Sequence, residues 1–251
     1  MPTARRWPPA EGRRSRKVSS MPERISGILP VHNEARVLGR VLDAIEQQTR
    51  RVDELIVVFD RCTDRSVEIA QGRAGRSVSV DLGNTAETVT AGIRAADGTH
   101  LVLFDGNTLV PREYVETVLQ VLARTSADLV EWHGGMMGFP RSTLDRFGPF
   151  SARYLWTLEY FLRIQARGGT VVRLDGPHTR LTPSPLARNL RYGLDYADLA
   201  VVYPIPPYFR IGTKSGWVPD SVALLGAVLG HARHHRLARS VAQAGRYLRS
   251  P

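Results

Sequence analysis

Apolar residues between Ile25 and Leu174 alternate between short continuous runs and longer stretches in which they recur every three or four positions. A short apolar run is typical of a buried strand, whereas the longer spacing is typical of a helix with one buried face. The runs predict strands at 25–31, 55–59, 77–82, 101–104, 129–132 and 170–174. The spaced stretches predict helices at 37–45, 64–74, 86–96, 115–122 and 152–166. This alternation predicts an α/β fold with a mostly parallel central sheet flanked by helices.

The chain divides into a long central part and two basic ends. Residues 1–20 are rich in Arg, Ser and Pro and predict a disordered basic tail, because they cannot bury enough apolar surface. Residues 21–219 predict one folded domain, which suits a chain of 251 residues with 43% hydrophobic content. Residues 220–251 place apolar side chains on one side and arginines further on, which predicts a basic amphipathic helix.

The net charge of +10 comes from these two ends. Residues 21–220 hold 23 basic and 23 acidic side chains, so the body of the protein is neutral. Proteins that bind nucleic acid more often spread basic and aromatic side chains over a folded face, so we expect no nucleic acid partner. Basic ends are typical either of a solvated segment or of weak attraction to an anionic membrane surface.

Cysteine usage and hydropathy bear on the compartment. Cys62 is the only cysteine, so no intramolecular disulfide is possible, and a cytoplasmic protein is expected. The N-terminus has no apolar signal region, and no apolar run reaches the roughly 20 residues that a spanning helix needs. With the basic C-terminal helix, this favours a protein that is soluble or peripheral at the inner face of the membrane.

Polar side chains follow two of the predicted strands. The sequence Pro30-Val31-His32-Asn33-Glu34 continues from the first strand, and Asp105-Gly106-Asn107 follows the strand at 101–104. The carboxyl ends of strands are where open α/β sheets bind ligands. Carboxylate and amide oxygens suit Mg²⁺ or Mn²⁺, so Asp105 and Asn107 are candidate metal ligands, the second of them a neutral one.

Two further segments carry candidate chemistry. Asp60 closes the strand at 55–59, where its carboxylate can accept an N–H from a nucleotide base. His178 and Arg180 lie just beyond the last predicted strand. His178 is either a third metal ligand or a structural histidine in a loop, and Arg180 is placed to hold phosphate oxygens. No G-x-G-x-x-G or P-loop sequence is present, which argues against dinucleotide oxidoreductases and nucleoside-triphosphate hydrolases.

Taken in order, these pieces resemble the inverting family-two glycosyltransferases of GT-A fold, over residues 25–200. The resemblance rests on Pro30 to Glu34, the Asp-x-x-Thr-Asp turn at 60–64, the helix end Gly-Ile-Arg-Ala-Ala-Asp-Gly at 92–98, the strand into Asp105, and the Arg-to-Gly spacing at 163–168. It implies a GT-A-like domain, a nucleotide-diphosphate sugar as donor, a hydroxyl acceptor and a divalent cation, Mg²⁺ or Mn²⁺.

The resemblance implies that Pro30, Glu34 and Asp60 contact the nucleotide and that Asp105 and Asn107 occupy the metal and diphosphate site. The loops after the predicted strands add Asn33, Arg180 and His178 to these candidates. The predicted nucleotide-binding residues are Pro30, Asn33, Glu34, Asp60 and Arg180. The predicted metal ligands are Asp105, Asn107 and His178. The acidic pair that supplies the family's catalytic base corresponds here to Trp156 and Thr157. Glu159 lies one helical turn away, so we predict it as the base; the alternative is an ordinary surface carboxylate.

Two functional hypotheses from different classes follow. The first is an enzyme that transfers a sugar to an unidentified hydroxyl acceptor, with inversion at the anomeric carbon; the basic C-terminal helix makes a lipid-linked acceptor conceivable. The second is a catalytically weakened family member that binds a nucleotide sugar and acts as a partner or regulatory protein. The altered positions Asn107, Trp156 and Thr157 motivate the second hypothesis.

Overall fold

The computed structural model describes residues 4–6, 23–133, 135–153, 155–174 and 176–182, together with residues 190, 191, 194, 195, 198, 199 and 203. The chain divides into two compact units. The first unit comprises residues 1–152 and 163–182, and the second comprises residues 153–162 and 183–251. All the described strands belong to the first unit.

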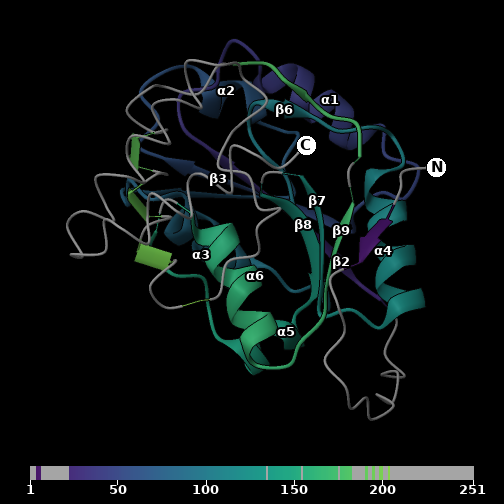
Figure 1. Cartoon of the computed structure of the whole chain (residues 1–251). Coiled ribbons are helices and arrows are strands. Elements are labelled where there is room, and N and C mark those ends of the chain that lie inside the picture. Colours follow the sequence, from purple (N-terminus) through teal and green to yellow (C-terminus); the bar gives the residue numbers. More distant parts are fainter. Residues whose placement is uncertain are drawn as a thin grey trace. The chain divides into compact units, whose positions relative to one another are not determined.

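One large sheet organises the first unit, with the strand order β1-β9-β7-β8-β5-β2-β3-β4 (Figure 1). Its strands are β1 (Ala4–Arg6), β2 (Ile25–Val31), β3 (Glu54–Asp60), β4 (Arg76–Val80), β5 (His100–Leu103), β7 (Leu129–His133), β8 (Met136–Pro140) and β9 (Val171–Leu174). Strands β5, β2, β3 and β4 are parallel to one another, and β7 is parallel to β9. β8 runs antiparallel to both β5 and β7, and β1 runs antiparallel to β9. A separate two-stranded sheet pairs β6 (Thr108–Leu109) with β10 (Thr179–Arg180).

The helices connect these strands. They are α1 (Leu38–Glu46), α2 (Ser66–Ala70), α3 (Thr85–Ala95), α4 (Tyr114–Thr125), α5 (Ser142–Phe147) and α6 (Trp156–Ala166), the last of which crosses from the second unit into the first. Each strand and helix predicted from the apolar pattern is present, with ends shifted by a few residues. The α/β class and the mostly parallel sheet are therefore confirmed.

Strand alternation decides which helices cover which face of the sheet. Leu29 and Val57 belong to a buried cluster that they share with apolar residues of α1, α2 and α4. Their neighbours Ile28 and Val58 point to the opposite face. There a Cβ atom on Gly92 of α3 would come within 2.7 Å of both side chains. Helix α3 therefore packs closely on the face opposite α1 and α2, and it does so because residue 92 is glycine (Figure 1).

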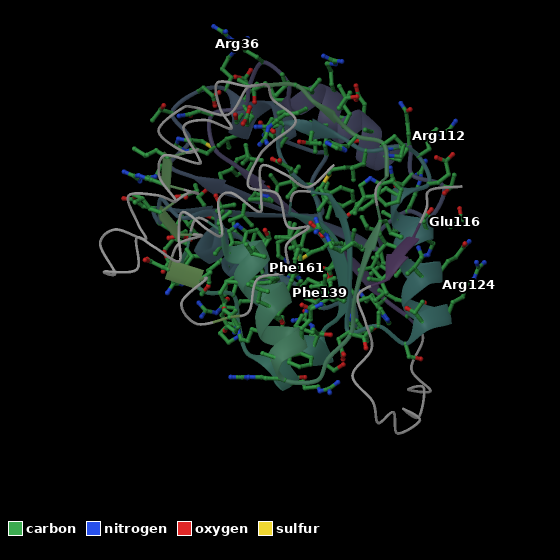
Figure 2. The ribbon with its side chains drawn as sticks, in the orientation of Figure 1. Arg36, Arg112, Glu116, Arg124, Phe139 and Phe161 are labelled. Carbon is green, nitrogen blue, oxygen red and sulfur yellow. The ribbon has the colours of Figure 1, made fainter. Side chains whose placement is uncertain are left out.

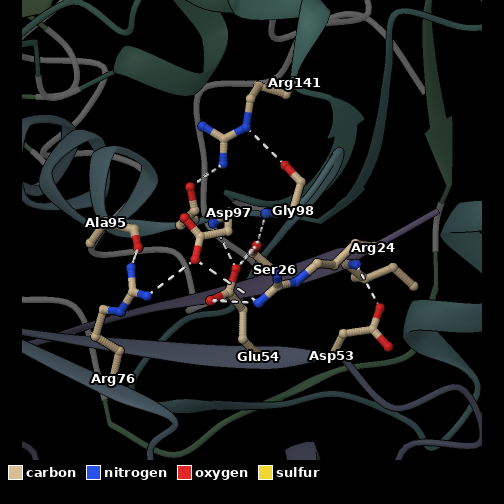
Figure 3. Close-up of polar contacts among 11 residues, drawn as sticks. Arg24, Ser26, Asp53, Glu54, Arg76, Ala95, Asp97, Gly98 and Arg141 are labelled. Atoms are coloured by element: carbon tan, nitrogen blue, oxygen red, sulfur yellow. Dashed lines mark hydrogen bonds and ion pairs between the residues drawn. The ribbon is translucent and has the colours of Figure 1, made fainter. Parts of the chain in front are cut away.

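A polar network ties the C-terminal end of α3 to the amino ends of β2 and β3 (Figure 3). The Glu54 carboxylate accepts hydrogen bonds from Ser26 Oγ at 2.6 Å and from the Asp97 backbone N–H at 2.7 Å. Ser26 Oγ in turn accepts from the Gly98 N–H at 2.8 Å, and Arg141 Nε donates to the Gly98 carbonyl at 2.8 Å. The helix-end motif at 92–98 thus has a packing role at the edge of the sheet away from the polar strand ends.

Strand β8 and helix α5 were missed in the sequence, where the apolar rhythm becomes irregular near Gly138. That glycine lies inside β8, and a Cβ atom there would come 2.4 Å from Cγ1 of Val118 in α4. Helix α4 can pack this closely on β8 only if position 138 carries no side chain. The same requirement removes the apolar residue that would have made the strand visible in the sequence.

The two ends of the chain are only partly described. Residues 4–6, inside the predicted disordered tail, pair with β9 as strand β1, and disorder of the tail stays a prediction. Backbone hydrogen bonds to a sheet edge order a short segment without any burial of apolar side chains. The rest of that tail and the predicted helix at 220–251 lie outside the described residues, and the boundaries of the single domain at 21–219 stay a prediction. None of the helices in the described part of the chain is long and apolar enough to cross a membrane.

Candidate functional site

Two polar loops meet at the carboxyl ends of β2 and β5. The Phe104 N–H donates to the Ile28 carbonyl at 2.9 Å and so continues the pairing of these strands towards the Asp105-Gly106-Asn107 loop. A Cβ atom on Gly106 would lie 2.8 Å from the carbonyl oxygen of Pro30. Because that obstacle is backbone, only glycine lets the loop run this close to the end of β2. The close approach brings both predicted motifs into one place.

Asn107 contacts the Glu34 carboxylate. Its Nδ2 donates to Glu34 Oε1 at 2.9 Å, and the asparagine is 7% exposed. An ionised carboxylate can only accept, so the NH₂ end of the amide must face Glu34. The Asn107 Oδ1 lies 3.3 Å from Thr108 Oγ1, and the Asn107 backbone carbonyl accepts from the Leu181 N–H at 2.7 Å. Asn107 thus holds Glu34 in position, a contact that the sequence did not reveal.

Asp105 lies beside Arg180. Arg180 Nη2 is 3.5 Å from Asp105 Oδ2, and the two side chains are 34% and 31% exposed. The same Oδ2 accepts a hydrogen bond from Thr108 Oγ1 at 3.1 Å. The antiparallel pairing of β10 with β6 places Arg180 opposite Thr108 and thereby brings it to the loop. A carboxylate and a guanidinium, both partly open to solvent, therefore stand together at this edge.

The Asp60 carboxylate accepts hydrogen bonds from other residues of the protein. Its Oδ1 accepts from the backbone N–H groups of Leu82 and Gly83 at 2.9 and 3.1 Å, and its Oδ2 accepts from Thr88 Oγ1 at 3.0 Å. Burial acts to raise the pKa of the Asp60 carboxyl, but these hydrogen bonds and the nearby Arg61 charge outweigh it and lower the pKa. The carboxylate therefore stays ionised and joins the end of β3 to the segment that leads into α3.

Asn33 has a similar connecting role. It adopts a left-handed backbone conformation with φ of 54°, which asparagine tolerates better than most residues. Its Oδ1 accepts from the backbone N–H groups of Thr63 and Asp64 at 2.8 and 3.3 Å. Nearby, His32 Nδ1 lies 2.6 Å from the Asp60 carbonyl oxygen. These contacts link the loop after β2 to the loop after β3, while the nucleotide-binding roles of Pro30, Asn33, Glu34 and Asp60 stay predictions.

The donor set does not fit a strong site for a divalent cation. Among the described residues, no group of three or more His, Cys, Asp and Glu side chains is placed to hold a metal ion. Asp105 offers one carboxylate, Asn107 turns its NH₂ group to Glu34, and the Arg180 guanidinium adds a positive charge nearby. His178 Nδ1 lies 3.3 Å from the Gly176 carbonyl, and its predicted role as a ligand stays a prediction.

Glu159 belongs to the part of α6 that lies in the second unit. It is 7% exposed, so the alternative of an ordinary surface carboxylate is wrong. The hydroxyl of Tyr203, in the same unit, donates to Glu159 Oε1 at 3.3 Å. A buried carboxylate with a hydroxyl neighbour is compatible with a catalytic base, and that role stays a prediction.

Curated relatives match about half of the chain. Glycosyltransferase GlyG of Streptococcus pneumoniae is 29% identical over 116 residues, which are 44% of this chain and 38% of the relative. The uncharacterized glycosyltransferase EpsJ of Bacillus subtilis is 28% identical over 127 residues, 49% of this chain and 36% of the relative. The chain thus matches well under half the length of these two relatives.

Solved structures show the same fold. The glucosyl-3-phosphoglycerate synthase of Mycobacterium tuberculosis, solved with Mn²⁺, UDP and glucosyl-3-phosphoglycerate, has a TM-score of 0.64 and 20% identity, over 73% of this chain and 81% of that one. A mannosyltransferase of Pyrobaculum calidifontis, solved with GDP-Man and Mn²⁺, has a TM-score of 0.65 and 18% identity, over 92% of this chain and 88% of that one. At this identity the likeness shows the fold alone, and it confirms the predicted GT-A-like architecture.

The family match covers most of the described site, with the exception of His178 and Arg180. It extends over residues 26–177, from β2 to the residue before His178, and its description is glycosyl transferase family 2. This range includes the loop after β2, Asp60 and the Asp105-Gly106-Asn107 loop. Because the match spans more than half of the chain and agrees with the fold, the chain belongs to glycosyl transferase family 2.

Proposed function

We propose that this protein transfers a sugar from a nucleotide-diphosphate donor, bound at the carboxyl ends of β2, β3 and β5, to a hydroxyl acceptor. The observation that carries the proposal is the close approach of the 105–107 loop to the end of β2, where a Cβ atom on Gly106 would lie 2.8 Å from the Pro30 carbonyl. It gathers Glu34, Asp105 and Arg180 at the edge where sheets of this class bind ligands.

The charged side chains at this edge have different roles in binding the donor. Arg180 provides N–H donors for the diphosphate oxygens, which a guanidinium can contact in pairs. Glu34 is held by Asn107 and is placed to accept hydrogen bonds from the nucleoside part of the donor. Asp60 and Asn33 keep the adjoining loops in place through their hydrogen bonds to backbone N–H groups. The UDP and GDP-Man complexes of the structural relatives support a nucleotide-diphosphate sugar as donor.

The reaction is a direct displacement with inversion. The acceptor oxygen attacks the anomeric carbon, the bond from that carbon to the diphosphate oxygen breaks, and the acceptor proton passes to a base. Glu159 is our candidate for that base, because it lies on α6 one helical turn from Trp156 and Thr157, the positions where the resemblance expects the acidic pair. Both structural relatives were solved with Mn²⁺, which supports the predicted cofactor, Mg²⁺ or Mn²⁺, but the described residues do not form a strong cation site and no step of this proposal passes through the ion.

A second function is favoured by two residues. Trp156 and Thr157 stand where the resemblance expects an acidic pair, so a family member that binds a nucleotide sugar without turnover is the alternative. Cytoplasmic location, attachment to an anionic membrane surface and a lipid-linked acceptor stay predictions. The last two rest on residues 220–251, outside the described part of the chain.

Calorimetric titration with UDP, GDP and their common sugar conjugates tests binding without knowledge of the acceptor. Release of the nucleotide diphosphate from the bound conjugate, measured with panels of sugar and lipid acceptors, then separates the two functions. Turnover that disappears in Glu159→Gln while binding persists supports the transferase. Binding without turnover across all panels supports the non-catalytic alternative, and absence of binding to every nucleotide sugar contradicts both.

A further inference from the structure

The charge balance at the site differs from that of a site with two acidic ligands. Position 107 follows Asp105 by two residues, where a D-x-D sequence would carry a second aspartate. Here it carries an amide whose NH₂ group donates to Glu34 at 2.9 Å. An aspartate in its place would put two carboxylates in contact, which is unfavourable unless a cation lies between them. With asparagine at position 107, no cation is needed between this residue and Glu34.

Arg180 adds a positive charge at the same place. Its guanidinium lies 3.5 Å from the Asp105 carboxylate, on a strand that is fixed by pairing with β6. The next residue, Leu181, is held by a 2.7 Å hydrogen bond from its N–H to the Asn107 carbonyl. The base of the arginine side chain is therefore tied to the loop that carries Asp105 and Asn107.

The guanidinium has capacity left for a ligand. Within the described residues, its one ion pair is the contact with Asp105, and the side chain is 34% exposed. A guanidinium has five N–H donors, so those not used by Asp105 can contact phosphate oxygens. A divalent cation that approached Asp105 would meet the repulsion of this charge.

From these observations, and resting on the proposed function, we propose that Arg180 and Asn107 together make nucleotide-diphosphate binding largely independent of a divalent cation. Arg180 supplies fixed positive charge to the diphosphate. Asn107 holds Glu34 without adding a negative charge that would repel the ligand. Asp105 orients Arg180 through the contact between their side chains.

The test is calorimetric titration of UDP and GDP into the full chain, once with EDTA and once with MnCl₂. We expect the wild-type protein to bind one of the two in EDTA with an affinity within about tenfold of that in Mn²⁺. Arg180→Gln should weaken binding in EDTA by about tenfold to a hundredfold, the value of lost charge-assisted hydrogen bonds, and Arg180→Lys by less. Arg124→Gln is the matched control, because Arg124 is an exposed arginine that points outward from α4 (Figure 2).

Asn107→Asp tests the other half of the inference. It should weaken binding in EDTA, because a new carboxylate faces Glu34 and the incoming diphosphate, and Mn²⁺ should restore much of the lost affinity. Titration of Mn²⁺ alone should show tighter binding to this variant than to the wild-type protein. If Asn107→Asp does not fold, as judged by circular dichroism, the comparison of Arg180→Gln with Arg180→Lys decides.

The outcomes separate this inference from the proposed function. Wild-type binding that is lost in EDTA and fully present in Mn²⁺ would overturn the inference and leave the proposed function standing. Equal binding by Arg180→Gln and the wild-type protein in EDTA would overturn the role of Arg180. Absence of binding to UDP, GDP and their sugar conjugates under both conditions would overturn the proposed function itself.

Discussion

Replacement of Asp60 by asparagine tests whether this carboxylate connects the end of β3 to the segment before α3. The carboxylate is 8% exposed and accepts hydrogen bonds from Leu82, Gly83 and Thr88. An asparagine can keep the two backbone donors at its oxygen and turn its NH₂ group to the threonine hydroxyl. The contacts then persist, but they lose the assistance of the negative charge.

The expected cost follows from the number and kind of hydrogen bonds. Hydrogen bonds to a charged acceptor are roughly twice as strong as neutral ones, so Asp60→Asn should lower the free energy of unfolding by about 2 kcal/mol at neutral pH. Asp60→Ala also leaves the partly buried N–H groups of Leu82 and Gly83 without their acceptor, so it should cost more, about 3 kcal/mol.

The pH dependence has a definite sign. The pKa of Asp60 is lowered by folding from its ordinary value of 3.8, so the folded protein binds this proton less readily than the unfolded chain. Its stabilising contribution is therefore fully present above about pH 3.8 and is lost as the pH falls through the folded-state pKa. Since asparagine does not titrate, the stability gap between the wild-type protein and Asp60→Asn should be widest at neutral pH and should narrow in acid.

Urea unfolding followed by circular dichroism, from pH 7 down into the acid range, measures both effects. Asp81→Asn is the control, because its carboxyl group is nearby but 90% exposed, and it should leave the unfolding midpoint unchanged. An unfolding midpoint at pH 7 that is equal for Asp60→Asn and the wild-type protein would refute the connecting role. If nucleotide binding were lost at the same time, Asp60 would instead be a direct contact to the nucleotide, as the sequence predicts.

The expected effects of the other substitutions each depend on one contact or one side chain. Asp105→Ala should reduce turnover by about a hundredfold with little change in thermal stability, since this carboxylate is partly exposed and orients the Arg180 guanidinium towards the diphosphate; equal activity would remove it from the site. Gly106→Ala should lower stability by about 1–3 kcal/mol in urea unfolding, because its Cβ would meet the Pro30 carbonyl, whereas Gly39→Ala in α1, with nothing within 4 Å, should be neutral or stabilising. Glu159→Gln should lower kcat by at least about a hundredfold and leave nucleotide affinity unchanged; a fall in affinity alone would contradict its role as the base.

The elements that could be predicted are those whose packing leaves a regular apolar pattern. Strands β2, β3 and β5 are buried on both faces and appear as continuous apolar runs, and α1 and α4 bury one face at helical spacing. Strand β8 packs too closely on α4 to carry a side chain at Gly138, so its pattern is broken. The pairs β6 and β10 are two residues each, too short to give any pattern.

Only part of the candidate site could be predicted from the sequence. Asp105 and Glu34 could be found because each follows a recognisable strand whose carboxyl end lies at the same edge of the sheet. The pairing of Arg180 with Asp105 was not predicted, because it depends on β10, which is distant from Asp105 in the sequence. Thr88 and Thr108 were missed, since a hydroxyl in a helix or a short strand carries no signal until its acceptor is known.

The contact between Asn107 and Glu34 changes what the altered motif means. From the sequence, an amide at position 107 is a weakened metal ligand. In the structure, Gly106 lets the backbone of this loop approach β2 so closely that residue 107 faces a carboxylate 2.9 Å away, and without a bound cation an amide donor suits that neighbour, whereas a second carboxylate would repel it. The asparagine therefore follows from the geometry of the loop, and together with Arg180 it favours a site that draws its positive charge from the protein.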